Sequence, residues 1–322
     1  MERVLVTGAD GFVAAHLIAE LAGELFCEIT GVGLKESPSI DVDCLEYALL
    51  DITEYEPLKD LLEEFKPDAV FHLAALPSVA LSWEDPWSTY RVNVLGQVNL
   101  MEAIRRLGLE TSVHIACSSE EYGKVPPEAM PMTEGMPFNP CSHYAVSKVA
   151  QEVLGLMYHQ AFDWRVIVTR GFNQAGPGQS SDFVISSFAR QIAEIEAGLC
   201  EPVMMVGNLE ARRDFMDVRD TVRAYRMVME KGKAGASYNV CSGHALAVSD
   251  VLDKLLEISG AEITVQRDPV RQRPSDIPLL LGDNTKLREE TGWEPIIDLE
   301  KTLSDTLDYW RGRVAGEQGD AN

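Results

Sequence analysis

The run Thr7-Gly8-Ala9-Asp10-Gly11-Phe12-Val13-Ala14 decides the expected fold, because it joins a strand-like segment at 4–7 to a helical pattern over 12–22. Glycines at such a junction let the backbone turn tightly and approach a pyrophosphate on the helix N-terminus. A Gly-rich turn can be purely structural, but its place between strand and helix favours binding. The third position of the motif is Ala14, which is small enough for close packing of helix on strand. We predict a dinucleotide site formed by Gly8, Asp10, Gly11, Phe12 and Val13.

Strand-like and helix-length segments alternate outward from this run. Strand-like runs at 28–32, 69–73, 112–117 and 165–169 alternate with helical patterns at 54–65, 89–107 and 144–161. Such alternation is typical of a parallel sheet covered by helices on both faces. We therefore predict an α/β protein with a Rossmann-like, doubly wound parallel sheet and a smaller C-terminal lobe.

The pattern changes after residue 175, where loops rich in Gly, Pro and Ser begin to separate the helical runs. A chain of 322 residues is long enough for two domains. We predict an NAD(P)-binding domain over 1–175 with a return segment near 215–245, a substrate-binding lobe mainly over 176–315, and a tail over 316–322.

The composition is that of an ordinary globular protein with a strongly acidic surface. The 28 Lys and Arg against 51 Asp and Glu give a net charge of −23, which repels nucleic acids and excludes them as expected partners. The six cysteines and six histidines show no metal-ligand spacing, so we expect neither a metal nor a disulfide framework. No targeting or membrane segment is visible, and we expect a cytoplasmic protein.

Two segments carry candidate catalytic groups. Tyr144 and Lys148 lie four residues apart, which stacks them on one face of a helix. A nearby ammonium favours the phenolate and lowers a tyrosine pKa, so Tyr144 is suited to proton exchange with a substrate oxygen, although such pairs also arise by chance. Ser118 and Glu120 follow the strand 112–117, at the edge where open α/β sheets bind ligands. The alternative for these two residues is loop capping or a solvated turn.

The end of the second strand bears on which dinucleotide binds. Residues 31–37 read GVGLKES and lack the carboxylate that binds the ribose of NAD, while Lys35 is suited to a 2′-phosphate. We therefore favour NADP over NAD, with a solvated surface lysine as the alternative. Asp51 and Ile52, after the third strand, are candidates for the adenine end, although Asp51 is equally suited to cap the next helix.

Together with two later segments, these motifs resemble the extended short-chain dehydrogenases/reductases, also called the NAD-dependent epimerase/dehydratase family. The later segments are RGFNQAGPGQ at 170–179 and RRDFMDVRD at 212–220. With YNVCSG at 238–243 and RPSD at 273–276, they are most similar to the members of that family that reduce GDP-4-dehydro-6-deoxy-D-mannose. The resemblance covers residues 3–311, and it departs from the usual motif at Gly171 and Gln174.

The resemblance implies reduction of the C4 ketone of GDP-4-dehydro-6-deoxy-D-mannose to GDP-D-rhamnose with NAD(P)H. It implies Tyr144 as general acid, Lys148 as the residue that orients the nicotinamide ribose, and Ser118 as the partner of the C4 oxygen. Glu120 matches the acid/base carboxylate of related dehydratases. Further cofactor contacts are implied at Leu73, Ala74, Ala75, Asn93, Tyr144, Lys148 and Gly171.

The nucleotide sugar would be held mainly by the second lobe. Guanidinium groups bind phosphate oxygens bidentately, and the resemblance favours Arg213 and Arg273 for the diphosphate or ribose. It also implies Asn173 as a donor to the diphosphate, Arg190 as a weaker contact, and Ser82 in the wall of the sugar pocket. The alternative for the arginines is a salt bridge with a surface carboxylate.

Two other functions stay open. One is a GDP-mannose 4,6-dehydratase or a nucleotide-sugar epimerase that recycles its NAD(P), and Glu120 alone does not decide between these and a reductase. The other is a non-catalytic dinucleotide sensor, against which the intact Ser118, Tyr144 and Lys148 argue. The helical patterns at 89–107 and 144–161 carry apolar residues on more than one face, which in this family form a four-helix bundle between two subunits, so a homodimer is expected.

Overall fold

The computed structural model describes residues 1–24, 27–268 and 277–320. The chain divides into two compact units, each assembled from three segments. Unit 1 consists of Met1–Gly171, Thr221–Val240 and Asp283–Glu294, and unit 2 consists of Phe172–Asp220, Cys241–Gly282 and Pro295–Asn322. None of the helices among the described residues combines the length and the apolar character that a membrane span requires.

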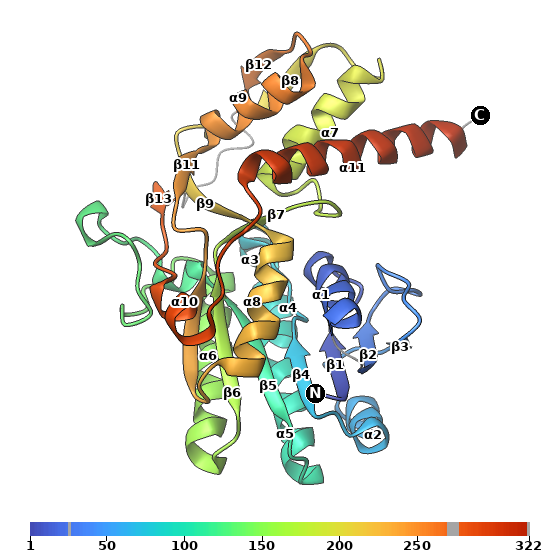
Figure 1. The fold of residues 1–322 in the computed structure, drawn as a ribbon, viewed down its shortest axis with the longest axis vertical. Coiled ribbons are helices and arrows are strands. Elements are labelled where there is room, and N and C mark those ends of the chain that lie inside the picture. Colours follow the sequence, from blue (N-terminus) through green and yellow to red (C-terminus); the bar gives the residue numbers. More distant parts are fainter. Residues whose placement is uncertain (25–26, 269–276, 321–322) are drawn as a thin grey trace. The chain divides into compact units, whose positions relative to one another are not determined.

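Unit 1 is built on a seven-stranded sheet with the order β10-β6-β5-β4-β1-β2-β3 (Figure 1). The strands are β1 (Arg3–Thr7), β2 (Glu28–Gly33), β3 (Leu45–Leu49), β4 (Ala69–His72), β5 (Ser112–Ser118), β6 (Val166–Gly171) and β10 (Ala236–Val240). Every neighbouring pair is parallel, so all strands end at the same edge. The strand order reverses between β1 and β4, where open α/β sheets bind ligands. The predicted doubly wound, Rossmann-like sheet is confirmed.

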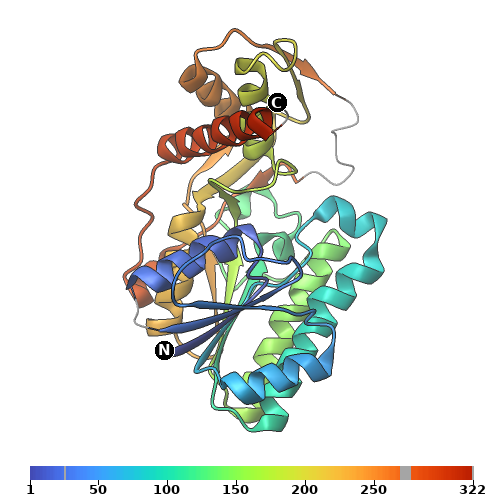
Figure 2. The same cartoon turned by 90° about the vertical axis from the view of Figure 1, so that its right-hand side faces the viewer.

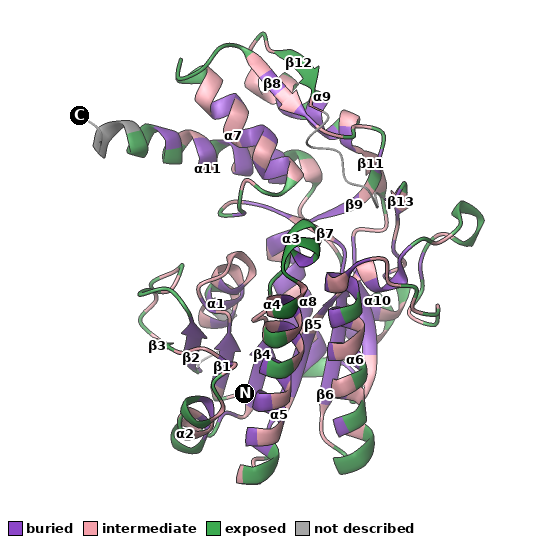
Figure 3. Ribbon diagram, turned by 180° about the vertical axis from the view of Figure 1, so that it is seen from behind, coloured by how far each residue is buried: buried purple, intermediate pink, exposed green. Residues whose placement is uncertain are grey.

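Helices cover both faces of this sheet: α1 and α8 lie on one face, and α2, α5 and α6 lie on the other (Figure 2). The helices that contribute to unit 1 are α1 (Phe12–Glu24), α2 (Tyr55–Phe65), α3 (Val79–Glu84), α4 (Pro86–Tyr90), α5 (Gly96–Leu107), α6 (His143–Phe162), α8 (Val218–Lys231) and α10 (Thr285–Thr291). The strands β1, β4, β5 and β6 are almost entirely buried between these layers (Figure 3). Leu58, Leu62, Leu100 and Ile104 of α2 and α5 pack into the core on one face of the sheet.

One predicted helix is divided in the structure. The sequence predicts a single helix over 89–107, but α4 ends at Tyr90, a π-helical turn covers Arg91–Leu95, and α5 begins at Gly96. The amide of Asn93 in this turn bonds outward to the segment after β4 and to α6 rather than to its own helix. Apolar periodicity does not distinguish a π turn from an α-helical one, and such turns frequently mark functional sites.

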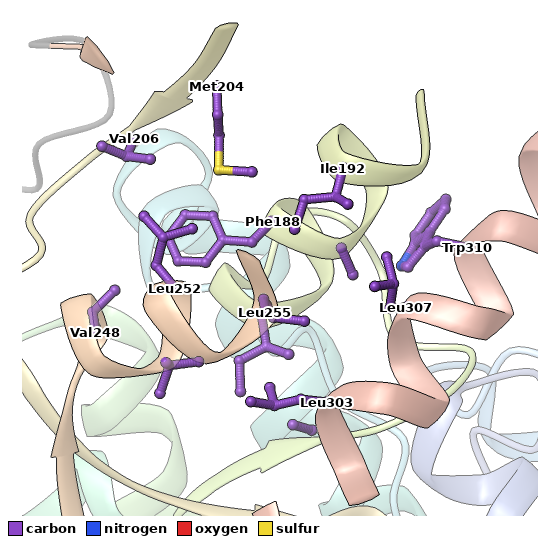
Figure 4. Close-up of a cluster of buried hydrophobic side chains, with 14 of the residues drawn as sticks. Phe188, Ile192, Met204, Val206, Val248, Leu252, Leu255, Leu303, Leu307 and Trp310 are labelled. Atoms are coloured by element: carbon purple, nitrogen blue, oxygen red, sulfur yellow. The ribbon is translucent and has the colours of Figure 1, made fainter. Parts of the chain in front are cut away.

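In the part of unit 2 that the structure describes, small sheets combine with three helices. Its strands are β7 (Asn173–Ala175), β8 (Val203–Val206), β9 (Arg212–Asp217), β11 (Ala245–Ala247), β12 (Thr264–Arg267) and β13 (Leu279–Leu280), and its helices are α7 (Val184–Glu196), α9 (Val248–Ser259) and α11 (Leu299–Asp320). β9 pairs with β7, β11 and β13, and β8 pairs with β12. Phe188, Leu255 and Leu307 from the three helices meet in one core (Figure 4). The buried Trp310 ring donates its N–H to Ser186 Oγ at 2.7 Å, so this core contains no unsatisfied indole.

Candidate active site

The turn between β1 and α1 forms a tight backbone cradle at the carboxyl edge of the sheet. Gly8 has φ 71°, and a Cβ atom built on it would lie 2.9 Å from Ala74 Cα, so glycine is required twice over. Gly11 N donates to Gly8 O at 2.9 Å, and α1 begins at the next residue, Phe12. The first N–H groups of α1 have no partner within the helix and are available to an anion. The cradle therefore fits the pyrophosphate of a nicotinamide dinucleotide.

The segment after β4 is held against this cradle by Thr7. Thr7 Oγ1 accepts hydrogen bonds from Leu73 N and Ala74 N, both at 3.2 Å, and lies 2.9 Å from His72 Nδ1. Burial lowers the pKa of His72 to about 3, and the nearby Lys148 acts in the same direction. His72 is therefore neutral, so its Nδ1 can accept a hydrogen bond from the Thr7 hydroxyl. Leu73 and Ala74, both predicted cofactor contacts, lie beside Gly8, with Ala75 following them in the chain.

Asp10 ties the cradle to the loop after β2. Its carboxylate accepts from Leu34 N at 3.0 Å and from Lys35 N at 3.1 Å, and Lys35 Nζ donates to Asp10 O at 2.9 Å. A Cβ atom on Gly33 would lie 2.6 Å from Asp10 Oδ1 and 2.7 Å from Tyr47 Oη. Position 33 therefore has no room for a side chain, and the carboxylate beside the end of β2 is that of Asp10.

The structure shows three further candidate cofactor contacts, Asp51, Ile52 and Asn93, in contact with other parts of the chain. Asp51 Oδ1 accepts from Thr53 N at 2.8 Å, while the N-cap of α2 is Glu54, so the interpretation of Asp51 as the helix cap is wrong. Ile52 is buried, and its side chain lies where a Cβ atom on Gly96 would clash. Asn93 is fully buried, accepts from Leu76 N at 2.7 Å and donates to Ser147 Oγ at 2.9 Å. Asn93 thus links the segment after β4 to α6.

Ser118, Tyr144 and Lys148 come together where β5 ends. Ser142 caps α6 by accepting from Ala145 N at 3.0 Å, and the helix then presents Tyr144 and Lys148 one turn apart. The Tyr144 hydroxyl is hydrogen-bonded to Ser118. Lys148 Nζ donates to Ala116 O at 2.8 Å and lies 5.9 Å from the centroid of the Tyr144 ring. The three side chains form one polar cluster, in which Tyr144 and Lys148 are buried and Ser118 is partly buried.

The pKa of Tyr144 differs from the expectation. Burial raises this pKa well above its usual value, the hydrogen bond with Ser118 opposes the rise, and the charge of Glu120 adds to it. Burial also lowers the pKa of Lys148. The expected lowering by Lys148 is absent because desolvation of the phenolate outweighs the neighbouring ammonium. Tyr144 is therefore a neutral phenol that can donate its proton.

Ser118 belongs to a tightly closed turn. A short 3-10 helix covers Ser119–Tyr122, and Ser118 Oγ accepts from Glu120 N at 3.3 Å. Glu120 is the second residue of this 3-10 helix and is only partly buried. Its negative charge raises the pKa of Tyr144. The turn therefore places one hydroxyl and one carboxylate beside the phenol.

The remaining predicted residues are distributed between the units. In unit 1, Gly171 ends β6, and the buried Ser82 of α3 donates to Val79 O at 2.7 Å. In unit 2, Asn173 begins β7, and its buried amide oxygen has no hydrogen-bond partner among the described residues.

The arginines of unit 2 have local partners. Arg213 of β9 donates to Arg212 O at 3.0 Å. Arg190 forms an ion pair with Glu194 at 2.7 Å and lies 5.4 Å from the centroid of the Trp310 ring. The salt-bridge alternative therefore holds for Arg190 in this structure. Arg273 lies outside the described residues.

A buried group of charged residues behind Ser118 is missing from the predicted site. Arg170 donates from Nε and Nη2 to the two oxygens of Glu152 at 2.9 and 2.6 Å, and Glu121 lies 3.4 Å from Arg170 Nε. Cys117, Glu121 and Glu152 offer ligand atoms within 4.8 Å of one another, but the Arg170 guanidinium already supplies the positive charge there. Glu152 lies four residues after Lys148 on the same helix face, which is the signal that points to it.

Comparisons with known proteins agree with this geometry. The family model described as GDP-mannose 4,6 dehydratase matches residues 5–306. The chain is 37% identical to GDP-6-deoxy-D-mannose reductase of Pseudomonas aeruginosa, covering 98% of this chain and 99% of the relative. It is 32% identical to UDP-glucose 4-epimerase of Mycolicibacterium smegmatis, covering 97% and 99%.

Two solved structures have the same fold. RMD from Pseudomonas aeruginosa complexed with NADPH has a TM-score of 0.86 and 35% identity, covering 97% of this chain and 100% of that chain. UDP-glucose 4-epimerase of Thermus thermophilus in complex with NAD has a TM-score of 0.86 and 29% identity, covering 96% and 99%. The β1–α1 turn of this chain has the backbone that such a dinucleotide requires. The match over nearly the whole chain confirms the resemblance seen in the motifs, and the protein belongs to the GDP-mannose 4,6 dehydratase family of extended short-chain dehydrogenase/reductase enzymes.

Proposed function

We propose that this enzyme reduces the C4 ketone of GDP-4-dehydro-6-deoxy-D-mannose to GDP-D-rhamnose with NADPH. The observation that carries the proposal is the cluster of Ser118, Tyr144 and Lys148 where β5 ends, at the carboxyl edge of the dinucleotide-binding sheet. The full-length similarity to a GDP-6-deoxy-D-mannose reductase supports the choice of substrate.

Three side chains divide the work on the ketone. When bound, the reduced dinucleotide supplies a hydride to the C4 carbon. Ser118 orients the C4 oxygen, and Tyr144 gives that oxygen its proton. A phenol that is still protonated when the strongly basic alkoxide develops can donate its proton to that oxygen, as a general acid must. The Lys148 ammonium, one helical turn away, stabilises the phenolate that remains and orients the nicotinamide ribose.

The cofactor would be held along the edge of unit 1. Gly8, Gly11, Phe12 and Val13 hold the pyrophosphate, with Leu73, Ala74, Ala75, Asn93 and Gly171 toward the nicotinamide. Asp51 and Ile52 serve the adenine. NADPH is favoured over NADH because the residues that end β2 bear no carboxylate and Lys35 supplies a cation, while the carboxylate of Asp10 beside them is held by two backbone N–H groups. We propose no metal, since ketone reduction by this route needs none.

The nucleotide sugar would be bound by residues that the family resemblance implies. Arg213 and Arg273 are assigned to the diphosphate or the ribose, Asn173 to the diphosphate, and Arg190 to a weaker contact. The buried amide oxygen of Asn173, which has no partner among the described residues, is consistent with a ligand contact. Ser82 is assigned to the sugar pocket.

A dehydratase is the second candidate function, because Glu120 lies beside Ser118 and its charge acts on Tyr144. A dehydratase would use Glu120 as its acid/base group and would consume no net reductant.

We further propose a cytoplasmic homodimer. Val146, Val153 and Met157 lie on one side of α6 and are 39%, 52% and 47% exposed, and Leu95 on the π turn is 48% exposed. A soluble monomer gains by burying such a face against a second copy. All six cysteines are free, which suits a reducing compartment.

The test separates reduction from dehydration by the products. Purified protein is incubated either with freshly prepared GDP-4-dehydro-6-deoxy-D-mannose and NADPH or with GDP-mannose alone, and the nucleotide sugars are separated by chromatography. We expect GDP-D-rhamnose in the first incubation and no change in the second. Formation of the ketosugar from GDP-mannose alone would identify a dehydratase and reject the proposed reaction.

A further inference from the structure

The inference concerns Glu121, a carboxyl group behind the turn that carries Ser118. Glu121 is fully buried. Ser118 N donates to Glu121 Oε1 at 3.2 Å, and Ser118 Oγ accepts from Glu120 N at 3.3 Å. Both the backbone and the side chain of Ser118 are therefore hydrogen-bonded within the turn. Any change in the position of the Glu121 carboxyl group is therefore passed directly to the Ser118 backbone.

The second oxygen of Glu121 has no fixed hydrogen-bond donor. It lies 3.4 Å from Arg170 Nε, but that guanidinium is already used by Glu152, by Tyr122 Oη at 2.8 Å and by Glu134 O at 3.1 Å. Two buried carboxyl groups thus compete for one guanidinium. The repulsion between two carboxylates this close and away from water is removed when one of them keeps a proton.

The groups that face Glu121 come from three elements. Cys117 lies on β5, Arg170 on β6, and Tyr144, Lys148 and Glu152 on α6. Burial and then the charge of Glu152 raise the pKa of Glu121 well above its usual range, against a smaller opposing effect of Arg170. Lys148 Nζ donates to Ala116 O at 2.8 Å rather than to Glu121. Within this group, Glu121 is therefore the carboxyl suited to keep the proton, with an oxygen of Glu152 within 4.8 Å as its neighbour.

We propose that Glu121 is a positioning residue: as a neutral carboxylic acid that donates to Glu152, it holds Ser118 in place without adding a negative charge beside Tyr144. An ionised Glu121 would disfavour the phenolate that forms when Tyr144 gives up its proton. The neutral acid avoids this cost and keeps both hydrogen bonds. The kinetic part of this inference rests on the proposed reduction, whereas the protonation state does not.

The first experiment detects the proton on the protein alone. Infrared spectra of the wild type and Glu121→Gln are recorded at neutral pH without substrate. We expect a carboxylic acid C=O band in the wild type that is missing from Glu121→Gln and retained in Glu128→Gln, a control on the Pro127–Ala129 turn. Absence of such a difference would overturn the proposal, whatever the enzyme reduces.

The second experiment measures ketone reduction against pH. Glu121→Gln, which preserves the neutral group, should keep kcat within about twofold and leave the pH profile unchanged. Glu121→Leu, which fills the space without accepting from Ser118 N, should lower kcat by about 10- to 100-fold with a smaller effect on KM. A shifted pH profile in a folded Glu121→Gln would mean that Glu121 acts as a charge, which contradicts the inference. The Gln variant gives this answer even where the Leu variant does not fold.

Discussion

At the residue scale, the proposed chemistry depends on a tyrosine that burial keeps protonated. Tyr144 is 9% exposed, and desolvation raises its pKa more than the hydrogen bond with Ser118 lowers it. In the proposed reaction the serine therefore serves two partners, since it orients the ketone oxygen and its hydrogen bond favours the phenolate of Tyr144. Its own position is set by the closed turn behind it.

Replacing Ser118 by Ala tests this double role. We expect Ser118→Ala to lower kcat/KM by about 100-fold, because the ketone oxygen loses its hydrogen bond and the pKa of Tyr144 rises further. Ser119→Ala removes the neighbouring hydroxyl of the same turn and is the matched control, with near wild-type kinetics. Equal losses in both variants would indicate damage to the turn instead.

Coenzyme choice also belongs to single residues. Lys35 follows the end of β2, and its Nζ donates to Asp10 O at 2.9 Å. Lys35→Ala should raise the KM for NADPH about tenfold and leave that for NADH nearly unchanged, because only NADPH carries the 2′-phosphate. Lys59→Ala on α2 is the control. A parallel change for both coenzymes would contradict this assignment.

At the scale of elements, local patterns and long-range contacts differ in how far the sequence reveals them. The Gly-rich turn and the Tyr144 and Lys148 pair are set by spacing within one segment, and the structure forms both as predicted. The π turn at Arg91–Leu95 has no distinct apolar period, and its cause is a side-chain contact of Asn93 with another helix. Three separate elements contribute the buried cluster of Glu121, Glu152 and Arg170. No motif within a single segment therefore predicts it.

The exposed face of α6 gives a prediction about assembly. Val153→Glu together with Met157→Glu should turn the dimer into a monomer in light scattering, because two copies would bury four like charges. Leu199→Glu, at an exposed position of unit 2, should leave the mass unchanged. A wild type with the mass of a monomer at working concentration would reject the proposed dimer.

At the scale of the whole molecule, the stability of the folded chain depends on two buried histidines that stay neutral. His72 and His114 are almost completely buried, and burial lowers the pKa of each from 6.5 to about 3. His114 lies 2.9 Å from Thr169 Oγ1 and 4.4 Å from the Tyr225 ring in the core of unit 1. Neither site has room for a hydrated imidazolium.

Stability should therefore fall on acidification. Below pH 6.5 the unfolded chain binds protons that the folded chain excludes down to a pH of about 3, so each histidine costs about 1.4 kcal/mol per pH unit across that window. Thermal unfolding of the wild type should show Tm falling as the pH decreases below 6.5. His114→Gln, which keeps a polar partner for Thr169 but does not titrate, should make this fall shallower. An unchanged pH dependence would show that His114 does not contribute.

The central claim is that Tyr144 donates the proton in an NADPH-dependent ketone reduction. The most direct measurement is the absorbance of the reduced nicotinamide in the presence of GDP-4-dehydro-6-deoxy-D-mannose, with Tyr144→Phe and the control Tyr309→Phe beside the wild type. The account predicts loss of absorbance in proportion to the ketosugar added, abolished in Tyr144→Phe and retained in Tyr309→Phe. A constant absorbance with the wild type, or an undiminished rate with Tyr144→Phe, would contradict it.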